Sequence, residues 1–257
     1  MLAEQVEYRE LLYRMVERDI MVRYKQTAMG FGWAVFMPLL NTAVFSVIFM
    51  RVAPIDTGGI PYPLFAFTGL LAWNYFASSL RFAVLSLSSN AVLVGKVYFP
   101  REILPASAVL VSAVDAMVAS IVLVVMLIYF RQPVGFAVAA LPVVFIVQTA
   151  LTIGIGLMLA MANLFFRDIK YLFEVTITIL MFGTSVLYPV NSVEGWPGVI
   201  LALNPMTQII QAYRDILFHN TPPVSAGFFG TALIAFGLLG IGWLRFHRAE
   251  FKFAEHV

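Results

Sequence analysis

Residues 103–130 read ILPASAVLVSAVDAMVASIVLVVMLIYF, an apolar run whose only charged residue is Asp115. A helix needs about 20 predominantly apolar residues to cross the hydrocarbon core of a bilayer, so this run predicts a transmembrane helix. Runs of similar character lie on either side of it, at 31–52, 62–85, 136–165, 171–190 and 226–246. We therefore predict an all-α integral membrane protein, a single domain over 1–257 with six transmembrane helices within 31–246.

The composition agrees with a membrane protein. Of the 257 residues, 61% are hydrophobic and 12% are charged, whereas a soluble domain is about a quarter charged. The net charge of +2 and the scattered arginines do not suggest nucleic acid as a partner. The chain has no cysteine, which excludes disulfides and thiolate metal sites, and its three histidines lack metal-ligand spacing. We therefore expect no metal site.

The first 30 residues predict an amphipathic helix over about 4–25. Charged residues share one face (Glu7, Glu10, Arg14, Glu17 and Arg18), and apolar residues share the other (Tyr8, Leu11, Leu12, Met15 and Val16). Such a helix can lie in the headgroup region with its apolar face in lipid, or it can be a solvated lead-in helix packed on a partner. The many charges before the first apolar run do not fit a cleavable signal peptide.

The basic residues are distributed unevenly between the predicted loops, and this bias sets the orientation. One side would hold most of them, in the N-terminal segment, the loops after the second and fourth spans, and the tail over 247–257. The other side would hold Arg51, Arg131 and Arg214. We therefore predict that both termini are cytoplasmic.

The segment 191–225 is the least regular part of the chain. The sequence EGWP at 194–197 and the pair NP at 204–205 interrupt two apolar stretches that are too short to span. Short apolar stretches of this kind dip into a membrane or lie on it. We predict two short outer-side elements, re-entrant in character, between the fifth and sixth spans.

The sequence carries no familiar catalytic pattern. It has no phosphate-binding loop ending in Gly-Lys-Ser/Thr, no HExxH and no Gly-x-Ser-x-Gly. Asp115 is a weak signal for a proton relay, and we favour a carboxyl that is hydrogen-bonded to a neighbouring helix or faces a wet cavity. We expect Arg81 to snorkel and Glu174 to lie near the inner end of its span. The chain is therefore not expected to be an enzyme.

Aromatic residues make up 14% of the chain and gather in or beside spans one, two and five. They fit an interfacial belt combined with core packing. The alternative is a surface that stacks on sugar rings, for which the candidates are Trp33, Phe36, Trp73, Tyr75, Phe76, Phe182 and Tyr188.

Two predicted inner loops combine charged and aromatic residues with stiff flanks, GKVYFPREILP at 95–105 and NLFFRDIKY at 163–171. Positive-inside anchoring explains their charge. It does not explain the prolines at 100 and 105, which suggest a shaped contact for a cytoplasmic partner.

The same stretches resemble the membrane-spanning permease subunits of ABC exporters for cell-surface polysaccharides, the O-antigen and teichoic-acid export group. The matching features are VRYKQT-x-x-GFGW at 22–33, KVYFPREILP at 96–105, FFRDI at 165–169, VLYPV at 186–190 and NP at 204–205. They occur in order over almost the whole chain. FPR followed by LP, and FRDI, are the most specific.

The resemblance implies a homodimeric permease in a bacterial cytoplasmic membrane, working with two copies of an ATPase subunit that binds ATP and Mg. It implies that Lys96, Tyr98, Arg101, Arg167, Asp168 and Lys170 couple the spans to the ATPase. Spans one, two and five would line a channel for a lipid-linked polysaccharide (O-antigen, capsule or teichoic acid), and 191–218 would form an outer gate. Basic residues of the N-terminal helix would meet the pyrophosphate of the lipid carrier: Arg14, Arg18, Arg23 and Lys25.

Three other functions stay open. An exporter of this architecture could carry a drug or a small lipid. An ion-coupled secondary transporter should show inverted repeats and more embedded acids, and an intramembrane enzyme should show clustered Asp, His or Ser. The sequence shows none of these features.

Overall fold

The computed structural model describes residues 8–25, 27–96, 99–250 and 253, and the regular structure of this part of the chain is helical throughout. Five helices are long and apolar enough to cross a membrane. They are α3 (Gly32–Val47) continued by the π-helical turn η1 (Ile48–Val52), α4 (Tyr62–Ser89), α6 (Ile103–Tyr129), α7 (Leu141–Phe165) with the 3-10 turn η2 (Phe136–Ala140) before it, and α11 (Ala226–Ala249). These match five of the six predicted spans closely.

The fifth predicted span, over 171–190, is not one long helix. The structure has the 14-residue helix α8 (Ile169–Phe182) there. At 1.5 Å per residue such a helix reaches about 21 Å, short of the roughly 30 Å hydrocarbon core. The chain continues through an irregular segment over 183–189, which the apolar character of 171–190 did not reveal.

The irregular segment has backbone carbonyls that would be costly to leave unpaired inside a membrane. Side chains from other elements bind them. Arg214 donates from Nη1 to the carbonyl of Ser185 and from Nη2 to that of Val186, both at 2.7 Å. Asn204 Nδ2 donates to the carbonyl of Gly183 at 2.9 Å. The helix can therefore stop at Phe182 because the following backbone is satisfied by the protein itself.

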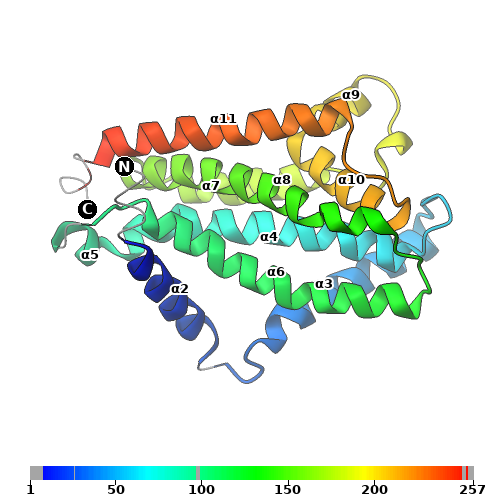
Figure 1. Ribbon diagram of the computed structural model, residues 1–257, viewed down its shortest axis with the longest axis horizontal. Helices are drawn as coiled ribbons and strands as arrows, with labels where there is room; N and C mark the ends of the chain where they lie inside the picture. Colours follow the sequence, from blue (N-terminus) through cyan, green and yellow to red (C-terminus); the bar gives the residue numbers. More distant parts are fainter. Residues whose placement is uncertain (1–7, 26, 97–98, 251–252, 254–257) are drawn as a thin grey trace.

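Two short helices follow, where two short elements were predicted. They are α9 (Trp196–Leu203) and α10 (Pro205–Phe218), with the 3-10 turn η3 (Val190–Ser192) before them. Asn204 accepts a hydrogen bond on its side chain from the backbone N–H of Met206 and so caps α10. Figure 1 shows α9 and α10 together at one end of the bundle. We call this the α9 end.

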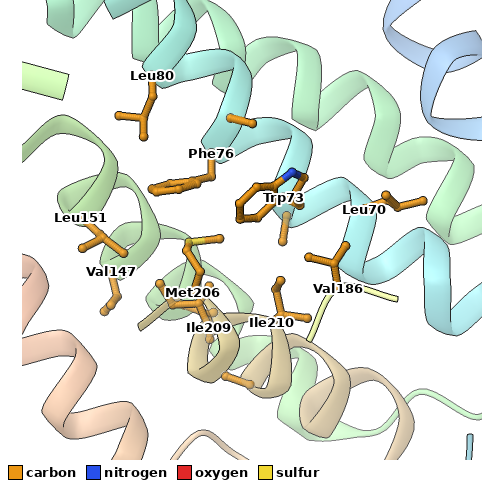
Figure 2. Close-up of a cluster of buried hydrophobic side chains, with 14 of the residues drawn as sticks. Leu70, Trp73, Phe76, Leu80, Val147, Leu151, Val186, Met206, Ile209 and Ile210 are labelled. Atoms are coloured by element: carbon orange, nitrogen blue, oxygen red, sulfur yellow. The ribbon is translucent and has the colours of Figure 1, made fainter. Parts of the chain in front are cut away.

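The opposite end of the bundle carries α5 (Ala91–Lys96) and the C-terminal end of α11, and we call it the α5 end (Figure 1). The helix α4 lies at the centre and contacts α3, α6, α7, α8 and α10. Its buried side chains Trp73 and Phe76 pack with Met206 and Ile210 of α10 (Figure 2). The helices α7 and α11 approach closely, because a Cβ at Gly242 would lie 2.7 Å from the Gly154 carbonyl oxygen.

The helix predicted over about 4–25 is present as α2 (Arg9–Tyr24) within the described residues. Its apolar side packs on the protein itself rather than facing outward: Met15 is buried in a cluster with Val94, Phe99 and Leu104, against which Leu11 and Leu12 also pack. In Figure 1, α2 runs diagonally away from the bundle and meets the start of α3 at a sharp turn. The apolar face, for which lipid or a partner was expected, is therefore covered at least in part by the chain itself.

Candidate functional site

The α5 end carries the residues that the sequence singled out for coupling. Lys96 is exposed at the end of α5, and Arg167 and Asp168 are exposed in the turn before α8. The backbone N–H of Lys170 donates to Asn163 Oδ1 at 3.2 Å, which fixes the start of α8 against α7. Tyr98 lies outside the described residues. The structure thus brings two charged turns to one end of the bundle.

Arg101 has a different setting from the other coupling candidates. Its backbone N–H donates to Glu250 Oε1 at 3.1 Å, and its Nη1 donates to the Glu250 carbonyl at 2.5 Å. Arg101 therefore ties the start of α6 to the end of α11. Burial raises the pKa of Glu250, and the charge of Glu102 raises it further, whereas the contacts with Arg101 act to lower it.

A group of three residues at the same place has the ligand types of a metal site. Glu102, His247 and Glu250 hold ligand atoms within 4.8 Å of one another. Glu250 is engaged by Arg101, however, and Glu102 Oε1 accepts a hydrogen bond from Trp243 Nε1 at 3.3 Å. These bonds give the group a structural role as a tie between α6 and α11.

The four basic residues proposed to meet a pyrophosphate are separated by the fold. Arg14 is 65% exposed and pairs with Glu17 at 3.1 Å, and Lys25 is exposed. Arg18 pairs with Asp19 at 2.8 Å and donates to Asn90 Oδ1 at 3.2 Å. Arg23 is turned inward. Only the last two reach the interior side of α2.

Arg18 and Arg23 line a cavity of about 410 Å³ between α2, α4 and α6. Its polar wall includes Ser86, Ser89 and Asn90 of α4, and its apolar wall is formed by α6. Guanidinium groups bind phosphate oxygens through paired, charge-assisted hydrogen bonds. The cavity therefore places two guanidinium groups beside an apolar surface, with Asp19, which pairs with Arg18, also in its lining and with Arg23 paired to Asp115.

Asp115 is held by α2, as expected for a carboxyl bound by a neighbouring helix. Arg23 forms an ion pair with it, and the Tyr24 hydroxyl donates to its Oδ1 at 2.6 Å. The Arg23 guanidinium also lies 4.0 Å from the centroid of the Phe82 ring. Burial, with a further contribution from the bond to Asp115, raises the pKa of Tyr24 to about 12. Asp115 is thus part of a fixed polar contact.

The aromatic candidates fall into two groups. Trp33 and Phe36 on α3 are partly exposed and meet edge to face, with ring centroids 5.8 Å apart. Phe182 is exposed at the end of α8, and the Tyr188 hydroxyl donates to its carbonyl at 2.5 Å. Trp33, Phe36 and Phe182 are therefore exposed, whereas Tyr188 is partly buried against the core.

The other three aromatic candidates are buried within α4. Trp73 and Phe76 belong to the core in Figure 2, and Tyr75 donates to or accepts from the Thr149 hydroxyl at 2.9 Å while stacking on Phe145. Their burial assigns them to packing within one copy. The sequence could not separate the two groups, because both follow the same pattern of aromatic residues on apolar helices.

Two charged features escaped the sequence. Arg214 was counted as an outer-loop residue, but it is fully buried, with its guanidinium 3.5 Å from the Phe65 ring centroid. The sequence signal that could have revealed its burial is its position among the apolar residues of α10. Arg81, which we expected to snorkel, instead reaches sideways to Glu174.

The described chain is thus a helical bundle with short helices at one end and charged turns at the other. The model of the family described as ABC-2 type transporter matches residues 10–218, so the chain belongs to this family. It is a multi-pass membrane permease, the non-catalytic component of an ABC-type transporter.

The particular relatives are permeases of polysaccharide export. The chain is 30% identical, over 99% of its length and 98% of the relative, to "O-antigen export system permease protein RfbA" of Myxococcus xanthus. A protein of the same name from Klebsiella pneumoniae is 31% identical over 96% of this chain and 94% of its own. "Polysialic acid transport protein KpsM" of Escherichia coli is 21% identical over 77% of each chain.

Proposed function

We propose that two copies of this chain form the channel of an ATP-driven exporter that moves a lipid-linked polysaccharide across the bacterial cytoplasmic membrane. The observation that carries this proposal is the end-to-end similarity to O-antigen export permeases. ATP, with Mg, is bound and hydrolysed by two copies of a separate ATPase subunit. This division of labour agrees with the missing phosphate-binding loop in the sequence.

The chain crosses the membrane six times, with α8 and the irregular segment after it completing the fifth crossing. The helices α4, α6, α7, α8 and α11 run in alternating directions between the α5 end and the α9 end (Figure 1). The excess of Lys and Arg in the segments at the α5 end makes that end cytoplasmic. The helices α9 and α10 then form a re-entrant gate at the outer surface.

The ATPase docks at the α5 end. Lys96, Arg167 and Asp168 are exposed there and supply charges of both signs to a partner. Lys170 and Arg101 lie behind them, bonded to α7 and α11 respectively, and pass movement of the turns to the spans. Tyr98 belongs to the same docking surface in this proposal.

The lipid carrier enters beside α2. Its pyrophosphate binds Arg18 and Arg23 in the cavity between α2, α4 and α6, while its hydrocarbon tail stays in the membrane. Arg14 and Lys25 lie on the exposed side of α2, where they attract the phosphates of membrane lipids.

The sugar chain passes between the exposed faces of α3, α4 and α8 of the two copies. Trp33, Phe36 and Phe182 offer flat apolar surfaces on these faces, and Tyr188 adds a hydroxyl at the outer end. Weak, repeated stacking holds a polymer without trapping it. A ligand shifts the equilibrium between two conformations of the transporter only if it binds them with different affinities. ATP binding to the partner therefore supplies the direction of transport.

The test is co-purification with the candidate ATPase in nanodiscs, followed by an ATPase assay. We expect a complex of two permeases and two ATPases whose activity changes on addition of lipid-linked glycan. A chain that purifies alone and responds to a proton or sodium gradient would contradict the proposal. The orientation is checked in the same cysteine-free chain, since Trp196→Cys should be labelled from outside and Lys96→Cys only after permeabilisation.

A further inference from the structure

Arg81 of α4 and Glu174 of α8 form a two-pronged ion pair. Nε of Arg81 donates to Oε1 of Glu174 at 2.7 Å, and Nη2 donates to Oε2 at 3.0 Å. The two side chains are 46% and 48% exposed. A paired but half-exposed charge within apolar helices is unusual. The residues around the pair indicate the environment that its exposed side contacts.

The pair lies about one helical turn inside the α5 end of the apolar stretch. Arg81 precedes the end of the apolar run at Leu85 by about 6 Å of helix, and Glu174 follows the start of α8 at Ile169 by about 7.5 Å, at 1.5 Å per residue. Charged side chains within membrane spans face a protein interior or a water-filled cavity, because hydrocarbon does not solvate them. The exposed side of the pair therefore faces water and not lipid tails.

A polar stripe on α4 continues from the pair in both directions. Asn74, Ser78, Arg81 and Ser88, with Leu85 between them, recur at intervals of three or four residues and so share one helix face. Asn74 and Ser78 are partly exposed, and Arg81 and Ser88 are exposed. This face of α4 therefore carries polar side chains over about four turns, interrupted by the exposed Leu85.

Each end of the stripe opens into a cavity. Asn74 lines a cavity of about 420 Å³ together with Asn41 and Trp33 of α3. Ser88 lines another, of about 200 Å³, together with Arg167 and Lys170. The stripe thus leads from the turns at the α5 end to the partly exposed aromatic residues of α3.

We infer that the Arg81–Glu174 pair and its stripe bind the hydroxyl groups of the sugar chain in the α5-end half of the pathway, an inference that rests on the proposed function. The pair leaves Nη1 of the guanidinium and further carboxylate lone pairs for a ligand. Donors and acceptors side by side match the neighbouring hydroxyls of a sugar. Because the pair is neutral overall, it offers these bonds without a net charge that would hold ions.

The competing explanation is that the Arg81–Glu174 pair only holds α4 against α8 and binds no sugar. Two double variants separate the explanations, because both remove the charges together and leave no unpaired ion. Arg81→Gln with Glu174→Gln keeps hydrogen-bonding groups, whereas Arg81→Leu with Glu174→Leu keeps only the volume. Thermal unfolding in nanodiscs and co-purification with the ATPase establish that each variant is folded.

Export of labelled lipid-linked glycan into proteoliposomes is the measurement. We expect the Gln–Gln protein to keep export within about threefold and the folded Leu–Leu protein to lose about tenfold or more, as for a lost hydrogen-bonding contact. Wild-type export by the Leu–Leu protein would overturn the inference, as would equal losses in both folded variants. A wild-type complex that moves no glycan would overturn the proposed function itself.

A direct contact is detected by a photoreactive amino acid placed on the stripe. With the residue at Ser78, we expect irradiation during transport to attach glycan to the permease. The matched position is Val125 on the exposed apolar side of α6, where we expect attachment to lipid only. Glycan attached equally at both positions, or at neither while export proceeds, would count against the stripe.

Discussion

Arg23 of α2 and Asp115 of α6 form an ion pair in which each side chain is only 20% exposed. The Tyr24 hydroxyl binds the second carboxylate oxygen. Two adjacent residues at the end of α2 thus converge on one acid in the membrane-spanning helix α6. The contact joins α2, which carries the proposed lipid-carrier site, to the bundle.

Breaking this contact should loosen α2. Asp115→Asn removes the ion pair but keeps a side chain of the same shape, and Arg23→Gln removes the partner. Because the two residues belong to one network, we expect a coupling energy of about 0.5–3 kcal/mol from the double-mutant cycle. Thermal unfolding of the four proteins in nanodiscs measures it.

A proton-relay role for Asp115 makes the opposite prediction. Asp115→Asn would then stop transport while leaving the unfolding temperature unchanged, and wild-type transport would depend on a proton gradient. The bonds from Arg23 and Tyr24 favour the structural role.

The exposed turn before α8 should be required for coupling but not for folding. Reversing a charge with Arg167→Glu or Asp168→Lys should reduce export by about tenfold or more, because the partner would meet a like charge at its docking surface. Exposed substitutions of this kind change stability by about 0.5 kcal/mol or less, so the fold should persist. Export in cells and co-purification with the ATPase are the measurements.

Arg131→Glu is the control for charge reversal, because Arg131 is exposed between α6 and η2, at the other end of the molecule and outside the proposed gate. It should leave export close to the wild-type level. Normal export by the Arg167 and Asp168 variants would remove these residues from the coupling surface.

Five spans were predictable because a long apolar run admits few alternatives in a membrane. The run at 171–190 predicted one long helix, and the structure differs from that prediction for a physical reason. Its hydropathy suits a span, but Arg214 and Asn204 bind the carbonyls after Phe182 and make a helix unnecessary there. Contacts of this kind join residues that are distant in the chain, so no local sequence pattern predicts them.

The residues of the candidate site likewise divide into those that the sequence reveals and those that only packing determines. Charged turns such as Arg167 and Asp168 are visible in the sequence because they interrupt apolar runs. Whether an aromatic residue faces out, like Phe36, or in, like Trp73, depends on which neighbour covers it. The partnership of Arg81 with Glu174 likewise depends on α4 and α8 packing side by side.

The tie between α6 and α11 should make stability depend on pH. The pKa of Glu250 is raised above its ordinary 4.5, chiefly by burial, so the folded protein binds its proton more tightly than the unfolded chain. The contribution of Glu250 to the free energy of unfolding therefore falls as the pH rises from 4.5 through the raised pKa.

Glu250→Gln should remove that contribution. Its side-chain oxygen can still accept the bond from the Arg101 N–H, so we expect the variant to match the wild type near the acid end and to exceed it at neutral pH. The difference in unfolding temperature between the two proteins, followed across pH in nanodiscs, is the readout. A difference that does not change with pH would show that the pKa of Glu250 is the same in the folded and unfolded protein.

Arg14 and Arg18 lie on different sides of α2, and their replacement should change binding of the lipid carrier to different extents. Arg18 lines the cavity with Ser86 and Asn90, whereas Arg14 faces outward and pairs with Glu17. Losing a charge-assisted bond to pyrophosphate in Arg18→Gln should raise the half-maximal concentration of lipid-linked glycan for ATPase stimulation about tenfold. Arg14→Gln should change it less than about twofold, since an exposed charge acts only through the screened surface potential. Equal effects of both variants that vanish in neutral-lipid nanodiscs would mean that general attraction to the membrane, and not the cavity, holds the carrier.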